Sequence, residues 1–172
     1  MKDATLLVIR NQHQGDCVVE NLIHYMLSSP FADTSEILAN GMRIDSMQHM
    51  VEDIYAVQEP LNMDHHRRMF HMVLTTRVSK DQQRNLDAGA NAVCDYFVML
   101  GHQTILVPHY GSADNYMNYH WHLAVNPISY QTGQRLWDKY ETYGAIVQYL
   151  NENTIPDWGW KYKNVSRATI TA

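Results

Sequence analysis

Two apolar runs separated by a polar segment constrain the fold more than any other feature of this sequence. The runs are "QTILVPH" (103–109) and "HWHLAVNPI" (120–128), and the segment between them is "YGSADNYMNY" (110–119). Each run has the length and the content of β-forming residues that are typical of a strand. Two such runs joined by a polar loop predict a β-hairpin, in which the two strands are antiparallel.

The rest of the chain alternates predicted strands and helices. Short apolar runs rich in β-forming residues predict further strands at 4–11 and 69–78. Apolar residues at helical spacing predict four helices, over 16–29, 46–59, 80–100 and 138–153. Alternation that ends in a hairpin suggests an α+β fold, an antiparallel sheet with helices packed on it.

The sequence shows no repeat and no linker composition. At 172 residues it is therefore expected to form a single domain over 1–172, in which the last ~20 residues are weakly patterned. No stretch approaches the roughly 18 to 20 apolar residues of a membrane span, and the apolar run before Arg10 is too short for a secretion signal. We expect a cytoplasmic protein with no membrane contact. Cys17 and Cys94 match neither a disulfide framework nor a zinc spacing and are interpreted as reduced packing residues.

A histidine pair stands at the head of the second strand of the predicted hairpin. Side chains two apart in a strand share a face, so His120 and His122 project together, whereas Trp121 points to the other face. If 103–109 is the partner strand, His109 falls near the same edge and three imidazoles converge. Three neutral nitrogens bind a divalent cation and leave coordination positions open, as in catalytic sites. The alternative is a set of core histidines bonded to the backbone.

The segment "VPHYGSADNYMNYHWHLAVNPISYQTGQRL" resembles the three-histidine signature of the relaxases, the mobilisation nucleases of conjugative and mobilisable elements. Relaxases belong to the HUH endonucleases, which are named for histidine, bulky hydrophobe, histidine. The segments "RRMFHMVLTTRVS" and "VVENLIHYML" are also similar to the family, so that the resemblance covers most of residues 5–150. It implies a relaxase-like two-layer sandwich. It also implies site- and strand-specific nicking of single-stranded DNA at the transfer origin of a plasmid or other mobile element.

The resemblance further implies roles for single residues. The implied ligands of Mg²⁺ or Mn²⁺ are His109, His120 and His122. His71 is the alternative to His109, because the gap between the first two ligands is a few residues longer than is usual in the family. Tyr25, on or beside the first helix, is the implied nucleophile, which forms a covalent 5′-phosphotyrosine. Asp114 is the implied partner that orients a ligating histidine.

Two rival functions remain open at this point. Tyr140, Tyr143 and Tyr149 follow the histidine motif at helical spacing, where a rolling-circle replication initiator or a transposase of the same superfamily carries its nucleophile. The simpler interpretation of these tyrosines is a helix face packed on the sheet. The second rival is a non-catalytic DNA-binding protein that retains the fold. Histidine-triad nucleotide-binding proteins fit less well, because Ala124 stands where their next alternating histidine would be.

DNA contacts would have to come from local groups, because the net charge of −5 argues against binding by bulk electrostatics. The candidate cations are Arg67, Arg68, Arg77, Arg84 and Arg135. The candidate stacking residues are Tyr110, Tyr116, Tyr119 and Trp121. The acidic balance predicts weak, salt-sensitive binding of single-stranded DNA by this chain alone, with accessory mobilisation proteins as further partners.

Overall fold

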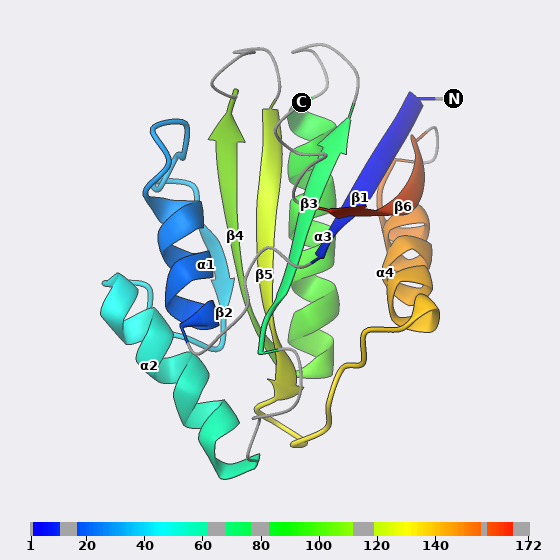
Figure 1. The fold of residues 1–172 in the computed structure, drawn as a ribbon. Helices are drawn as coiled ribbons and strands as arrows, with labels where there is room; N and C mark the ends of the chain where they lie inside the picture. The colour runs from blue at the N-terminus through cyan, green and yellow to red at the C-terminus, as the bar shows by residue number, and fades with distance from the viewer. Residues whose placement is uncertain are drawn as a thin grey trace.

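The computed structural model describes residues 2–10, 17–61, 68–76, 83–111, 119–155 and 158–166, which form one sheet with helices against it (Figure 1). The strands are β1 (Lys2–Arg10), β2 (Leu38–Asn40), β3 (Phe70–Thr76), β4 (His102–Tyr110), β5 (Tyr119–Ser129) and β6 (Trp158–Ser166). The helices are α1 (Val18–Leu27), α2 (Met47–Gln58), α3 (Gln83–Leu100) and α4 (Tyr140–Asn153), and a short 3₁₀ turn, Glu59–Leu61, follows α2.

The sheet has the strand order β2-β4-β5-β3-β1-β6. Its pairs are antiparallel except β1 with β6, which run parallel. The predicted hairpin is present as β4 and β5, with His109 directly opposite His120. The expected α+β fold with an antiparallel sheet and packed helices is therefore confirmed.

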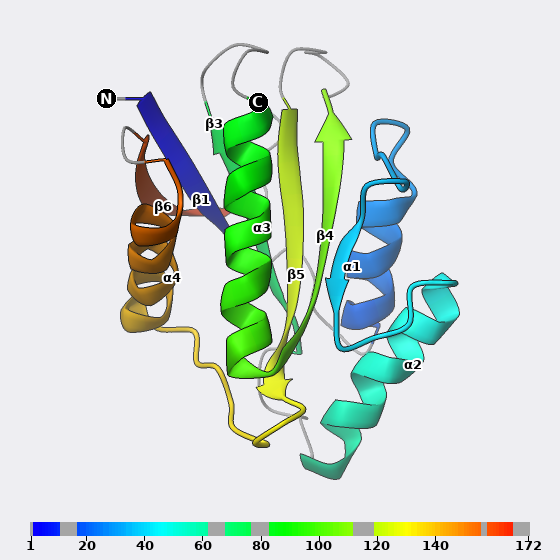
Figure 2. The ribbon, with the colours of Figure 1, turned by 180° about the vertical axis from the view of Figure 1, so that it is seen from behind.

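One face of the sheet packs against α3 and α4, which Figure 2 shows in front of the strands. Alternate side chains of the central strands supply this core, among them Met72 and Leu74 of β3 and Leu123 of β5, all fully buried. From the helices, Phe97 of α3 and Ile146 of α4 complete it. The period of two along each strand determines which residues enter this core.

The other face packs against α1 and α2, which lie over the β4 and β5 side of the sheet (Figure 1). Leu22, Ile23 and Met26 of α1 are fully buried there against Ile105 and Val107 of β4. The same alternation that sends Leu123 to the α3 side sends His109 of β4, and His120 and His122 of β5, to the α1 side.

Two strands were not expected from the sequence. The weakly patterned tail forms β6, whose Trp158 and Trp160 are only 4% and 2% exposed. β2 has three residues and precedes a turn at Gly41, where a φ of 72° requires the conformational freedom of glycine.

The cysteine interpretation holds for one residue of the two. Cys94 on α3 is partly buried against the core, as expected of a packing residue. Cys17 is exposed at the position just before α1, so its interpretation as a packing residue is wrong. Cys17 precedes the first helical residue, and the buried stripe of α1 starts at Val18.

Among the described helices, none combines the length and apolar character needed to cross a bilayer.

Candidate active site

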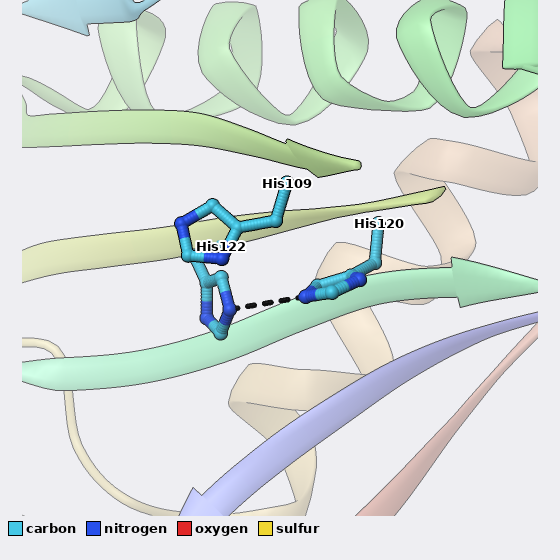
Figure 3. A group of neighbouring side chains, drawn as sticks. All are labelled: His109, His120 and His122. Atoms are coloured by element: carbon cyan, nitrogen blue, oxygen red, sulfur yellow. Dashed lines mark hydrogen bonds between the residues drawn. The ribbon is translucent and has the colours of Figure 1, made fainter. Parts of the chain in front are cut away.

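The hairpin register brings the three predicted histidines together. His109 near the end of β4 lies opposite His120, and Val107 lies opposite His122. Cross-strand partners point to the same face of a sheet, so the three imidazoles gather on one face of the hairpin (Figure 3). This is the face on which His109 contacts Met26 of α1. One possible ligand atom from each ring lies within 4.8 Å of those of the other two.

The spacing of the nitrogens of His120 and His122 fits a shared cation. Nε2 of His120 and Nε2 of His122 are 3.2 Å apart, the contact drawn in Figure 3. Two nitrogens bound at 2.0–2.1 Å to one ion lie about 2.9 to 3.4 Å apart for octahedral or tetrahedral angles. The ring of His109 completes the group, with its centroid 4.3 Å from that of His122. Three imidazoles of this kind are a ligand set for a transition-metal divalent ion.

His109 is held in one ligand-competent form. Its Nε2 donates to the backbone carbonyl of Met26 on α1 at 2.8 Å, and since a carbonyl only accepts, Nε2 carries the proton. Nδ1 therefore keeps its lone pair for a cation. Burial lowers the pKa of His109, and the hydrogen bond to Met26 only partly opposes this. The ring is consequently neutral near pH 7, as a metal ligand must be.

His71 lies beside the three histidines rather than among them. It projects from β3, two residues before Val73, which lies opposite His122. Its Nε2 is 3.0 Å from Nδ1 of His122, and the two rings are stacked with centroids 5.2 Å apart. The group of converging ligand atoms contains His109 and does not contain His71. Geometry thus favours His109 over His71 as the third ligand.

Tyr25 approaches the histidines from the last turns of α1. Its ring meets that of His122 edge-on with centroids 5.4 Å apart, and that of His71 at 5.8 Å. The side chain is 37% exposed, so it is packed on one side and accessible on the other. α1 is fixed at this point by the hydrogen bond from His109 to Met26, the residue after Tyr25. The structure therefore joins the predicted nucleophile and the predicted ligands through one helix–strand contact.

The three rival tyrosines lie on α4, which packs on the opposite face of the sheet. Tyr143 is 1% exposed and contacts Phe70 within that core. Tyr149 packs against a tyrosine of α3, and Tyr140 against Tyr162 of β6. The sheet stands between these rings and the histidines. The interpretation of this helix as packed on the sheet is the one that the geometry supports.

The predicted cations that the structure describes are divided between the two ends of the sheet. Arg135 pairs with Ile128, which is eight residues from His120 along β5 and thus about 26 Å away. Arg68 lies two residues before the start of β3, also near that far end, where its carbonyl accepts a hydrogen bond from Gln58. Arg84 is exposed in the first turn of α3. Three residues lie outside the described part of the chain: Arg67, Arg77 and Asp114.

The prediction that Trp121 could stack on DNA bases is wrong. It is 3% exposed in the core under α3, where its Nε1 donates to Asp87. Tyr110 is 38% exposed at the end of β4, and its ring lies 4.8 Å from that of Tyr119. Both rings lie at the histidine end of the hairpin but on the α3 face of the sheet, where Tyr119 packs against the core and donates its hydroxyl to Asp87. Tyr116 lies outside the described residues.

Comparison with known families decides the class of protein. The model of a relaxase family, described as the MobA/VirD2-like nuclease domain, matches residues 25–155. The chain belongs to this relaxase family. The match begins at Tyr25 and includes all three converging histidines. Membership makes the chain a DNA-nicking enzyme of the relaxase class, in a family that binds single-stranded DNA and depends on a metal. Comparison with curated proteins and with solved structures found no match.

Proposed function

We propose that this relaxase domain nicks one DNA strand at the transfer origin of a plasmid or other mobile element, with Tyr25 as the nucleophile. His109, His120 and His122 hold the cation, Mn²⁺ or Mg²⁺, and imidazole ligands favour Mn²⁺ of the two. The observation that carries the proposal is the edge-on contact of Tyr25 with His122, in a side chain that stays 37% exposed. A nucleophile needs both features, proximity to the ligands and access for DNA.

The proposed reaction is a transesterification. The phenolic oxygen of Tyr25 bonds to phosphorus while the bond from phosphorus to the 3′-oxygen breaks, which leaves a 5′-phosphotyrosine and a 3′-hydroxyl. The departing oxygen takes up one proton, and the phenol gives up one. One phosphodiester replaces another, so a later 3′-hydroxyl can reverse the step.

The side chains contribute in two ways. A protonated phenol is a poor nucleophile at neutral pH. A divalent cation, when bound, polarises the scissile phosphate and offsets the charge that develops on it. His109 presents a lone pair on Nδ1 because Met26 fixes its Nε2–H. The packing of Tyr25 against His122 limits the positions of the phenol, which lowers the entropy cost of in-line attack.

Accessory mobilisation proteins are part of this proposal. The net charge of −5 means that the chain as a whole repels DNA at long range. Partners that bind the transfer origin in the cytoplasm would supply the affinity and part of the sequence specificity. The proposal assigns to this domain the cleavage chemistry and the recognition of the single strand near the nick.

The test is covalent capture of DNA by the full chain. The protein is incubated with Mn²⁺ and labelled single-stranded oligonucleotides that tile the candidate transfer origin, and adducts are separated on a denaturing gel. We expect an adduct with the wild type and with Tyr140→Phe, a control at a side chain that is 76% exposed. Tyr25→Phe should form none.

Two outcomes would contradict the proposal. An adduct that persists in Tyr25→Phe and is lost in Tyr140→Phe would assign the chain to the initiators or transposases. A wild-type chain that binds the oligonucleotides and forms no adduct with any of them, with or without Mn²⁺, would be a DNA-binding protein without cleavage activity.

A further inference from the structure

The two ring nitrogens of His122 face two different histidines. Nε2 faces Nε2 of His120 at 3.2 Å, and Nδ1 faces Nε2 of His71 at 3.0 Å. A neutral imidazole carries one proton, on one of its two nitrogens. If Nε2 binds a cation, Nδ1 must carry the proton and donate it. The group that receives this hydrogen bond is His71.

His71 is fixed well enough to act as a defined acceptor. It is 4% exposed, and β3 holds it by pairing with Ala124 of β5 on one side and Ile9 of β1 on the other. Its ring is stacked on that of His122 and meets the edge of Tyr25. One buried side chain thus contacts both a proposed ligand and the proposed nucleophile.

We infer that His71 is a positioning residue, which accepts the Nδ1–H of His122 and so holds Nε2 of that ring toward the cation. This inference rests on the proposed metal centre and adds a role to a side chain outside the three ligands. Outer partners of ligating histidines are usually carboxylates or carbonyls, which fix the tautomer and the ring orientation. Here a neutral imidazole takes that place.

The test compares Mn²⁺ affinity across substitutions of His71, measured on the full chain from the free-ion signal in electron paramagnetic resonance. His71→Phe keeps a stacked ring but has no acceptor, and we expect about a 10- to 100-fold weaker affinity. His71→Gln places an amide oxygen near the position of Nε2. It should restore the affinity to within a few-fold of the wild type.

Two further variants keep the test decisive. His71→Asn is also polar, but its shorter side chain places the amide at the position of Nδ1, so we expect it to bind Mn²⁺ as weakly as His71→Phe does. This matched pair of amides answers the question even if His71→Phe does not fold. His120→Ala, which removes a ligand, establishes that the measured ion is at the three histidines.

The outcomes separate this inference from the proposed function. If His71→Phe and His71→Asn bind Mn²⁺ like the wild type while His120→Ala does not, the positioning role is overturned and the metal centre stands. If His71→Gln is as weak as His71→Phe, His71 acts as a fourth ligand and the positioning role is again overturned. A wild-type chain that binds no Mn²⁺ would overturn the metal centre, and the role of His71 with it.

Discussion

At the scale of single residues, a buried neutral histidine makes the stability of this fold sensitive to acid. His102, at the start of β4, is 5% exposed, and its Nδ1 donates to the carbonyl of Asn126 at 2.9 Å. Burial lowers the pKa of His102, and the hydrogen bond only partly opposes this. A lowered folded pKa stabilises the protein above the unfolded pKa of about 6.5. That contribution to stability is lost progressively as the pH falls from the unfolded pKa through the folded pKa of His102.

His102→Asn tests this contribution, because the asparagine amide donates from the same position and does not titrate. The free energy of unfolding in urea is measured at about pH 7.5 and about pH 5. We expect the wild type to lose more stability than the variant between these values. His24→Asn, at an exposed position on α1, is the control that should lose as much as the wild type. Equal losses in the wild type and in His102→Asn would show that His102 does not contribute.

At the scale of elements, Asp87 ties α3 to the strand that carries two of the ligands. Its Oδ1 accepts hydrogen bonds from the hydroxyl of Tyr119 and from Nε1 of Trp121, the residues on either side of His120. Burial raises the pKa of Tyr119, as does its bond to the carboxylate, so its phenol remains a donor. The register of β5 against α3 therefore depends on one carboxylate.

Asp87→Ala should destabilise the fold by about 1–3 kcal/mol, because it leaves the buried indole N–H of Trp121 without its acceptor. Asp87→Asn keeps one oxygen in the same position and should cost less. Urea unfolding at neutral pH measures both. The assigned role fails if the alanine variant is as stable as the wild type, or if the asparagine variant is the less stable of the two.

The elements that the sequence predicted are those with a local pattern. The hairpin follows from two apolar runs with a polar loop, and the alternation within β5 correctly sent Trp121 and His122 to opposite faces. The approach of Tyr25 to the histidines is a different case, because it came from the family resemblance. No periodicity within α1 indicates which strand that helix covers.

What the sequence did not predict depends on contacts between distant segments. β6 pairs with β1 across almost the whole chain, from Lys2 with Trp158 onward, and nothing within either segment specifies the partner. The position of His71 beside His122 has the same origin, since it requires β3 to lie next to β5. The signal available in the sequence is the alternation of side chains in β3, which gives His71, Val73 and Thr75 one face.

At the scale of the whole molecule, the two ends of the hairpin differ in chemistry. One end carries the three histidines. The other is closed by buried amides: Asn126 donates to Gln103 and accepts from Gln58, which ties α2 to both strands of the hairpin. A buried, connected set of amides of this kind rigidifies structure. DNA is therefore expected at the histidine end.

This polarity predicts which arginine contacts DNA. α3 begins at the histidine end, where Gln83 donates to the hydroxyl of Tyr110, so Arg84 lies there and Arg135 lies at the far end. Single-strand affinity is measured by fluorescence anisotropy between about 50 and about 200 mM NaCl. Arg84→Ala should reduce the slope of log K against log salt by about 0.7, the value for one lost phosphate contact. Arg135→Ala is the matched control and should leave the slope unchanged, because its guanidinium is beside Trp137 on the loop after β5. A reduced slope in Arg135→Ala with an unchanged one in Arg84→Ala would place the DNA at the wrong end of the sheet for cleavage at Tyr25.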